Sequence, residues 1–230
     1  WKSMELTIMY KADMSYYPSY VEIDVIHSID ASIRAKAISL YVYDTFKEKL
    51  NEDFEKREGL LFVGGFAHPP NADAVLWFAR EIFPAIRKEL PDVKFYVVGS
   101  KVTDEIQALE QPDNGIVIKG FVSDEELERL YASCRVVVGP LRYGAGVKGK
   151  VLEALYNGAP VITTSIGAEG IPFVDQALKI EDTAEGFACQ TTGLYQNPEL
   201  CRQMQRSTQD YMKKHFSLDG AWDIIKDDFT

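Results

Sequence analysis

The stretch Pro140-Leu-Arg-Tyr-Gly-Ala-Gly-Val-Lys-Gly-Lys-Val-Leu-Glu-Ala-Leu155 combines three basic side chains, three glycines and one glutamate in sixteen residues. The apolar run that overlaps its start, 135–141, predicts a buried strand, and residues 150–156 predict a helix. Glycines at 144, 146 and 149 let the connecting loop turn several backbone N–H groups toward one point. The stretch therefore predicts a strand, a glycine-rich loop and a helix, in that order.

The charge of this loop predicts an anionic ligand. A helix N-terminus presents unpaired N–H groups and a partial positive charge. Arg142, Lys148 and Lys150 add full positive charges, and no acidic residue precedes Glu153 in the stretch. A small phosphorylated molecule is the natural ligand for such a loop.

Composition narrows the class of partner. The 230 residues carry a formal net charge of −10 and a pI near 4.9. Nucleic-acid binding needs a broad basic surface, so we expect no nucleic-acid partner and favour a single nucleotide. Cys134, Cys189 and Cys201 lack metal-type or redox-type spacing, which predicts simple packing roles in a reducing compartment. No apolar run approaches the ~20 residues of a membrane span, and we expect a cytoplasmic protein.

Strands and helices alternate along most of the chain, which is typical of βα units around a parallel sheet. Helix 71–90 is expected to begin with Asn71 as N-cap and to kink at Pro84, and a capping box at Ser123 opens another helix. The order predicts an α/β, Rossmann-like parallel sheet with helices on both faces and a ligand beyond the carboxyl ends of its strands. The expected strands are 60–65, 94–99, 116–121, 135–141, 158–164 and 177–180, and the remaining helices are 150–157, 198–216 and 218–229.

The first 35 residues fit this order poorly. We expect a helix at 2–13, a strand at 14–19, a helix at 20–28 and a strand at 36–43. A lone helix and strand cannot bury their faces, so this leader calls for partner elements that the sequence does not contain. We therefore expect a piece of a longer protein, with an embellished single domain as the alternative.

The run PLRYGAGVKGKVLEALYNGAPVITTSIGAEGI at 140–171, with LLFVGGFAHPPNADAVLWF at 60–78, resembles the carboxy-terminal half of family-4-like glycosyltransferases of the GT-B fold. The resemblance implies three parts. Residues 1–35 would be a remnant of the amino-terminal, acceptor-binding domain and the crossover, and residues 36–216 the nucleotide-sugar-binding domain. Residues 217–230 would be the helix that packs toward the amino-terminal domain.

The function implied by this resemblance is transfer of a sugar from a UDP-sugar or GDP-sugar to an acceptor hydroxyl, with retention at the anomeric carbon. It implies no metal and no cofactor, and an acceptor that is a glycan or a lipid-linked glycan. The candidate loops offer lysines where a metal-dependent transferase would offer an Asp-x-Asp pair. Asp227-Asp228 is interpreted as solvated surface. Peripheral attachment at the inner face of the membrane remains an option.

The resemblance also implies residue roles. Glu153 would accept hydrogen bonds from both ribose hydroxyls, although a helix-dipole role is the alternative. Lys148 and Lys150 would neutralise the diphosphate, although either lysine alone is compatible with simple solvent exposure. Gly64 and Gly65 would let the backbone approach the donor, or would only make a tight turn. The remaining predicted donor-binding residues are Gly120, Phe121 and Val122 at the nucleobase, Leu141 and Tyr143 as pocket walls, and Gly144, Ala145, Gly146 and Val147 in the glycine loop.

The sequence departs from the family pattern at two places in the predicted donor site. The family commonly has a second glutamate eight positions before the one matched by Glu153, and Ala145 stands there. The identity of the donor sugar is therefore not predicted. In a branch of the family with the pattern Gly-Ala-Gly-Val-Lys, backbone amides hold the donor instead. The loop 66–71 lacks the basic residues that many relatives use on the diphosphate, so Lys148 and Lys150 are expected to supply that charge. His68 is a candidate base, with a turn residue as the favoured interpretation.

Two functions of different classes stay open. One is the donor-binding half of a retaining glycosyltransferase, and the other is a non-enzymatic nucleotide-binding or interaction module with a Rossmann-like shell. An oxidoreductase is disfavoured because the dinucleotide fingerprint is absent. Glu153 together with the two lysines favours the enzyme, since a purely structural shell would not need them.

Overall fold

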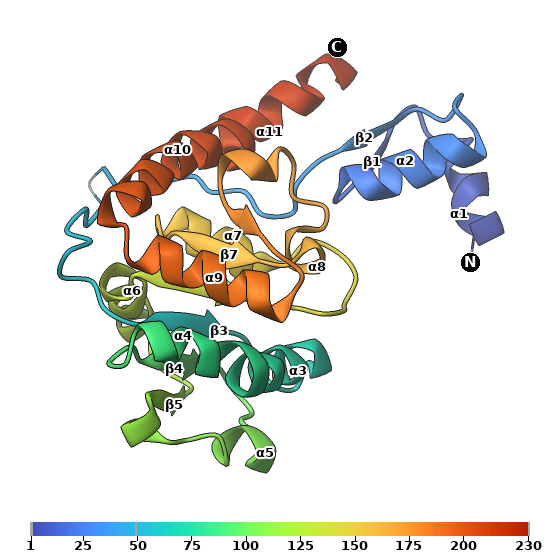
Figure 1. Cartoon of the computed structure of the whole chain (residues 1–230). Helices are drawn as coiled ribbons and strands as arrows, with labels where there is room; N and C mark the ends of the chain where they lie inside the picture. Colours follow the sequence, from blue (N-terminus) through green and yellow to red (C-terminus); the bar gives the residue numbers. More distant parts are fainter. Residues whose placement is uncertain (1, 49, 230) are drawn as a thin grey trace.

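The computed structural model describes residues 2–48 and 50–229. Its centre is a sheet of six parallel strands in the spatial order β5-β4-β3-β6-β7-β8 (Figure 1). This is the Rossmann-type order, in which the sheet grows outward in both directions from its first strand. The strands are β3 (Leu60–Val63), β4 (Phe95–Val98), β5 (Ile116–Gly120), β6 (Val136–Gly139), β7 (Val161–Thr163) and β8 (Lys179–Ile180). The predicted fold class is confirmed.

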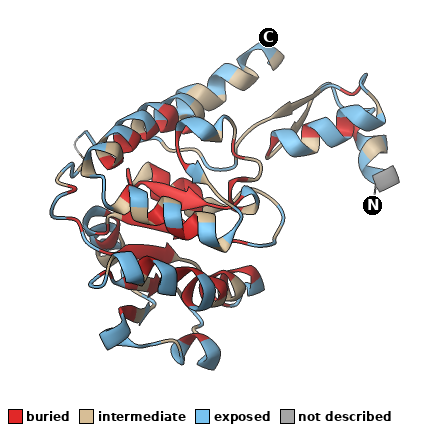
Figure 2. Ribbon diagram, in the orientation of Figure 1, coloured by how far each residue is buried: buried red, intermediate tan, exposed pale blue. Residues whose placement is uncertain are grey.

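Alternate strand residues build a separate core on each face of the sheet, because successive side chains point to opposite sides. Leu60 and Phe62 face one core, together with α3 (Pro69–Trp77), α4 (Phe83–Glu89) and α9 (Ala184–Tyr195). Leu61 faces the other core, with α6 (Asp124–Ser133), α7 (Gly149–Tyr156) and the carboxyl half of α10 (Pro198–Phe216). The buried strands between exposed outer helix faces are visible in Figure 2.

The helix predicted over 71–90, with a kink expected at Pro84, is interrupted just before that proline. A π-helical turn, η1 (Phe78–Ile82), separates α3 from α4, and the amide of Phe83 donates to the carbonyl of Phe78. Pro84 has no N–H to continue the regular helical pattern, so the wider turn just before it accommodates the proline. Asn71 is not the N-cap. His68 occupies that position, and Pro69 and Pro70 form the first turn.

Several elements were not predicted from the sequence. Helix α9 is the largest of them, and its sequence AEGFACQTTGLY contains two glycines and two threonines. The shorter ones are α5 (Asp104–Gln107), η2 (Pro112–Asn114), α8 (Ser165–Ala168) and η3 (Val174–Gln176). Cys134 and Cys201 are buried and Cys189 is exposed, and all three are free thiols.

The leader forms a small βαβ unit of its own. Strands β1 (Ser15–Tyr17) and β2 (Ala35–Ala37) pair in parallel, with α1 (Lys2–Met9) and α2 (Tyr20–Ile29) packed on them. Met9, Ile23, Ile26 and Ile33 make a separate small core. The strand expected at 36–43 is wrong beyond Ala37, because the chain leaves the small sheet there and crosses toward α10.

The carboxyl end of the chain contacts this leader unit. Helix α11 (Leu218–Ile225) continues into η4 (Lys226–Asp228), and the Asp228 carboxylate lies 2.7 Å from the Lys36 ammonium. The Tyr16 hydroxyl donates to the same carboxylate at 2.7 Å. The interpretation of Asp228 as solvated surface is therefore wrong: its side chain is mostly buried, and these two contacts lower the pKa of its carboxyl.

Candidate functional site

Two glycine-rich loops meet where the strand order reverses. Strands β3 and β6 are adjacent in the sheet although many residues separate them in the chain. The loop after β3 holds Gly64 and Gly65, and the loop after β6 runs from Pro140 to Lys148. Both leave the carboxyl edge of the sheet, which is the usual ligand position in such folds.

Asn71 joins these two loops. Its side chain is 4% exposed, its amide nitrogen donates to the Gly65 carbonyl at 2.7 Å, and its amide oxygen accepts a short hydrogen bond from the Lys150 ammonium. A Cβ atom built on Gly64 would lie 3.0 Å from the Lys150 nitrogen. The glycine therefore leaves room for the ammonium between the two loops.

Lys150 is a charged group without an acidic partner in the described part of the chain. Its ammonium contacts Asn71 and lies 5.3 Å from the centre of the Phe62 ring. Burial, with a smaller contribution from Lys148, lowers the pKa of Lys150 to about 8. A bound anion would stabilise the ammonium form, so this lysine is suited to an anionic ligand.

The other two basic residues already have acidic partners. The Lys148 ammonium lies 3.2 Å from a Glu169 carboxylate oxygen and also donates to the Gly146 carbonyl. Arg142 pairs with Asp73 on α3 through two hydrogen bonds. The expected excess of three positive charges is thus wrong for the folded site, because residues far away in sequence bring carboxylates to two of them.

Helix α7 begins without a cap. No side chain accepts from its first turn, and within the described residues the amides of Gly149 and Lys150 donate no hydrogen bond. Gly144 and Gly146 have φ angles of 118° and 79°, which other residues rarely adopt. The predicted arrangement of a glycine loop that leads into an open helix N-terminus is present.

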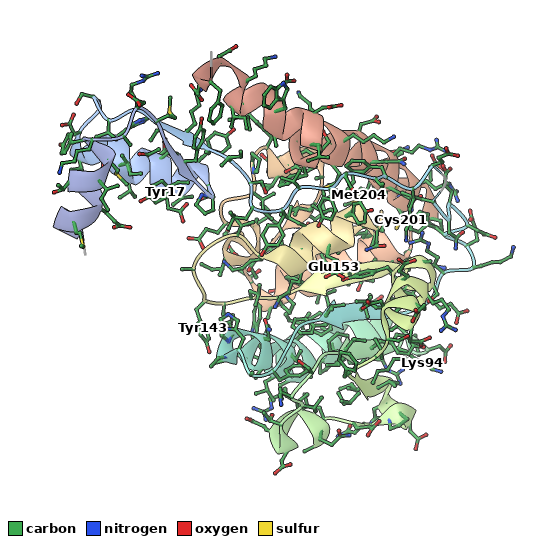
Figure 3. The ribbon with its side chains drawn as sticks, turned by 180° about the vertical axis from the view of Figure 1, so that it is seen from behind. Tyr17, Lys94, Tyr143, Glu153, Cys201 and Met204 are labelled. Carbon is green, nitrogen blue, oxygen red and sulfur yellow. The ribbon has the colours of Figure 1, made fainter. Side chains whose placement is uncertain are left out.

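Glu153 lines a cavity of about 600 Å³ next to this helix start. Its carboxylate makes no hydrogen bond or ion pair in the described part of the chain, and burial raises its pKa. Gly149 lies in the same cavity wall one turn earlier. Figure 3 shows Glu153 on α7. A half-buried carboxylate without protein partners is available to accept hydrogen bonds from a ligand.

A buried hydroxyl lines the same cavity. Tyr131 is 1% exposed, and its hydroxyl has no hydrogen-bond partner among the residues that the structure describes. Buried polar groups nearly always have a partner, so an orphan hydroxyl at a cavity wall favours a polar occupant. The ring of Tyr43 stacks on Tyr156 at 4.0 Å between centroids and completes this wall.

The cavity is electrostatically polarised along α7. Asp124 and Glu128 lie at its α6 end, whereas the open amides of α7 lie at the other end. The Glu128 carboxylate is paired with Lys47 at 3.3 Å, so Asp124 is the carboxylate that would repel an anionic part of a ligand, whereas the helix N-terminus would attract it. A neutral, hydroxyl-bearing part suits the region between Glu153 and α6.

The remaining predicted residues lie around the same edge of the sheet. Gly120 ends β5 with a φ of 65°, and Phe121 and Val122 follow it, with Phe121 79% exposed. Tyr143 and Ala145 are exposed, and Val147 is half-buried. Leu141 is 1% exposed inside the first core, so its side chain packs against the sheet and does not form a free wall. His68 is exposed at the N-cap of α3.

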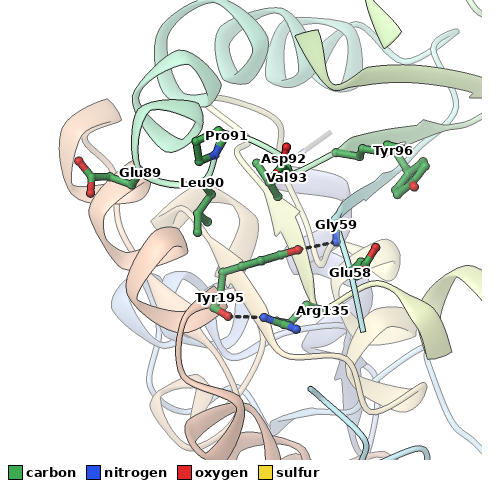
Figure 4. A pocket seen from close by; sticks show the side chains of 11 residues that line it. Glu58, Gly59, Glu89, Leu90, Pro91, Asp92, Val93, Tyr96, Arg135 and Tyr195 are labelled. Atoms are coloured by element: carbon green, nitrogen blue, oxygen red, sulfur yellow. Dashed lines mark hydrogen bonds between the residues drawn. The ribbon is translucent and has the colours of Figure 1, made fainter. Parts of the chain in front are cut away.

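A separate cavity of about 310 Å³ lies at the opposite edge of the sheet (Figure 4). It surrounds Arg135, which donates to the Tyr195 carbonyl at 2.9 Å, while the Tyr195 hydroxyl accepts from the Gly59 amide at 3.0 Å. These bonds tie β3, β6 and α9 together at the amino ends of the strands. The polar groups at this edge thus serve packing, and the candidate site stays at the carboxyl edge.

Sequence reasoning missed four residues that shape the site. Asn71, Asp73 and Glu169 hold the three basic side chains, and Tyr41 lies against the start of α7. The polar residues Asn71 and Asp73 in the first turns of the otherwise apolar helix α3 were a usable signal for the first two. Nothing in the local pattern around Tyr41 or Glu169 points to the glycine loop.

Comparisons with known proteins define the class. The sequence model of one family, described as glycosyl transferases group 1, matches residues 57–197, which is more than half of the chain. The chain belongs to this family. Its fold is the carboxy-terminal half of the GT-B fold, as the resemblance implied.

Particular proteins are similar to this chain in sequence or in fold. An uncharacterized 44.6 kDa protein in the cps region of Klebsiella pneumoniae is 36% identical over 116 residues, covering 48% of this chain and 30% of that protein. TarM of S. aureus, solved with UDP, α-GlcNAc-glycerol and Fondaparinux, has a TM-score of 0.73 at 18% identity and covers 100% of this chain and 47% of its own. The C-terminal domain of LpcC from Francisella tularensis has a TM-score of 0.57 at 19% identity, over 75% of this chain and 95% of that domain. The chain thus spans less than half the length of the first two.

Among residues 2–48 and 50–229, no group of three or more His, Cys, Asp and Glu side chains is arranged to hold a metal ion. In the same residues, no helix combines the length and apolar character needed to cross a bilayer.

Proposed function

We propose that this chain is the donor-binding half of a retaining glycosyltransferase that uses a UDP-sugar or GDP-sugar without a metal ion. The observation that carries the proposal is the Glu153 carboxylate, unpartnered in the described structure, in a cavity that ends at the uncapped N-terminus of α7. Family membership supplies the reaction class. TarM, whose structure holds UDP, provides a relative of the same fold that binds such a nucleotide.

The polarity of the cavity orients the donor in this proposal. The diphosphate lies at the amides of Gly149 and Lys150, the ribose hydroxyls donate to Glu153, and the base extends toward Gly120, Phe121 and Val122. As the glycosidic bond breaks, the leaving diphosphate gains negative charge, and the helix N-terminus and Lys150 stabilise that charge. No carboxylate pair is needed to hold a cation in this scheme.

The acceptor site lies mainly outside this chain in the proposal, because the chain spans only the carboxy-terminal half of the GT-B fold. We infer that the acceptor, a glycan or a lipid-linked glycan, binds mainly to the amino-terminal half, so this chain by itself binds the donor without transferring sugar. The relative in a cps region favours polysaccharide synthesis as the setting. We place the reaction in the cytoplasm, where nucleotide sugars are the donors, with peripheral attachment to the membrane as an option.

Calorimetric titration tests the proposal. We expect UDP or GDP to bind and NAD not to bind, because the dinucleotide fingerprint is absent. Glu153→Gln should weaken nucleotide binding by roughly tenfold or more, since hydrogen bonds to a charged group contribute about 1.5–3 kcal/mol. Glu185→Gln, on the exposed side of α9, is the matched control. Equal nucleotide affinities of the Glu153 variant and the control would contradict the proposed contact between Glu153 and the ribose. Nucleotide binding without sugar transfer in the full-length protein would favour a non-enzymatic module.

A further inference from the structure

Tyr41 lies directly against the first residue of α7. A Cβ atom built on Gly149 would be 2.6 Å from the Tyr41 hydroxyl oxygen and 2.7 Å from its Cε1. Gly149 has no positive φ angle, so its backbone alone does not require glycine. The close approach of the phenol accounts for the absence of a side chain at 149, and it places the hydroxyl beside the open amides of the helix.

The segment that carries Tyr41 forms a local turn and is anchored to the domain two residues later. The Ser39 hydroxyl donates to the Tyr41 carbonyl at 3.0 Å and accepts from the Tyr41 amide at 3.0 Å. Two residues later, the Tyr43 amide donates to the Phe216 carbonyl at 2.7 Å and the Tyr43 ring stacks on Tyr156. The Tyr41 ring is therefore directed toward α7 by a fixed backbone, and the neighbouring Leu40 points outward with 76% exposure.

The Tyr41 hydroxyl has no hydrogen-bond partner in the described part of the chain, and it lines the same cavity as Glu153. The free phenolic O–H lies beside the first residue of α7, where the amides of Gly149 and Lys150 are also free, so three donors lie at one helix start. Phosphate oxygens accept hydrogen bonds and donate none at neutral pH, so such a cluster fits a phosphate.

We propose that Tyr41 is a donor-binding residue whose hydroxyl donates to a phosphate oxygen of the nucleotide. The inference rests on the proposed function and adds a residue from outside the 57–197 region matched by the family model. It also makes the crossover segment part of the donor site, so the phosphate contacts come from both the Rossmann-like domain and the connection to the leader.

The test compares nucleotides with nucleosides. UDP and uridine, and in parallel GDP and guanosine, are titrated into the native chain, Tyr41→Phe and Leu40→Ala. Removal of the hydroxyl alone should weaken binding of the diphosphate about tenfold, as expected for a hydrogen bond to a charged acceptor. Nucleoside binding should change less than twofold, and Leu40→Ala should resemble the native chain.

A second substitution checks the contact itself. Gly149→Ala should weaken diphosphate binding in the native chain because its methyl group displaces the phenol. In a Tyr41→Ala background the same change should have much less effect, so the two losses should not add. Additive losses, or a Tyr41→Phe variant that binds the diphosphate as tightly as or more tightly than the native chain, would overturn the inference. If neither UDP nor GDP binds the native chain, the proposed function itself is contradicted.

Discussion

Lys150 shows how one residue links burial to binding. Its ammonium is held by Asn71 and desolvated by the surrounding loops, which lowers its pKa to about 8. At neutral pH the charged form is therefore retained at a cost, and an anionic ligand would offset that cost. Lys148 differs, because Glu169 already neutralises it. The two lysines of one short segment thus have different electrostatic states.

The lowered pKa of Lys150 predicts a pH dependence of nucleotide binding. If the ammonium form contacts the diphosphate, the complex raises the pKa of Lys150 and binding takes up a proton near pH 8. The affinity for UDP should then fall as the pH rises from 7 to 9, because the free protein loses this proton. Lys150→Met should bind more weakly at pH 7 and lose the slope. Titration in buffers of different ionisation enthalpy measures the proton uptake, and an unchanged slope in the variant would exclude Lys150 as its source.

Glu169 is predicted to restrain Lys148. Glu169→Gln removes the ionic partner but keeps the shape, so the ammonium becomes available to the diphosphate. We expect UDP affinity to rise about threefold, while the melting temperature changes little because a partly exposed ion pair contributes only ~0–1 kcal/mol. Calorimetry and a thermal melt measure the two quantities. Weaker binding in this variant would indicate that Glu169 supports the bound donor.

At the level of elements, the ends of β3 and β4 approach each other closely beneath the site. A Cβ atom on Gly99, just after β4, would lie 2.0 Å from the carbonyl oxygen of Gly64. The Gly64 amide also donates to the Val98 carbonyl at 2.9 Å. The position of the first glycine loop is therefore set by the neighbouring strand, which lets Gly64 face Lys150.

Gly99→Ala should displace this loop. The new methyl group would collide with backbone, so we expect a loss of about 1–3 kcal/mol in the free energy of unfolding, the usual size of an overpacking effect. Gly193→Ala in α9 is the control, since no described atom lies within 4 Å of its Cβ position apart from its chain neighbours and the helix's own backbone. That helical substitution should stabilise the protein by ~0.5–1 kcal/mol. Urea unfolding measures both values, and similar values for the two variants would contradict the close approach.

Across the whole molecule, the leader and the carboxyl end of the chain form one contact region. Asp228 joins η4 to both strands of the small sheet through Tyr16 and Lys36, and Lys36 also donates to the Ile224 carbonyl at 3.0 Å. The central sheet does not take part in these bonds. The leader is thus attached to the domain through the last helix and the crossover, and Ser19 also lies against Gly170, where an added Cβ would be 2.8 Å from the Ser19 Cβ.

This attachment should be sensitive to acid. Lys36 and Tyr16 lower the pKa of Asp228 below its unfolded value, so the contact is fully present above about pH 4 and weakens as the pH falls through the folded pKa. Asp228→Asn should raise amide hydrogen exchange in residues 15–37 at pH 7 and leave β3–β7 unchanged. Asp223→Asn, which removes only the exposed ion pair with Lys226, is the control. Equal exchange in both variants would exclude Asp228 as the attachment.

The prediction of the fold succeeded wherever the signal was local. The apolar strands, the break near Pro84 and the helix at Pro198–Phe216 are all visible in short windows, because period and turn residues act within a few positions. Helix α9 was missed since its two glycines and two threonines hide its apolar face. The short strand β2 was overextended for the opposite reason, because apolar residues continue into the crossover.

From the sequence alone, local patterns predicted the parallel α/β architecture, the glycine loop and the α7 helix, and the resemblance to a family pointed to Glu153. Only the tertiary structure decided which charges remain unpaired and which side chains reach the loop. Arg142 meets Asp73, Lys148 meets Glu169, and Tyr41 meets Gly149 across long separations in the chain. The physical reason is that the hydrophobic periodicity of a helix or strand depends on residues close in sequence. The partner of a charged side chain depends instead on which elements the spatial order of the strands brings together.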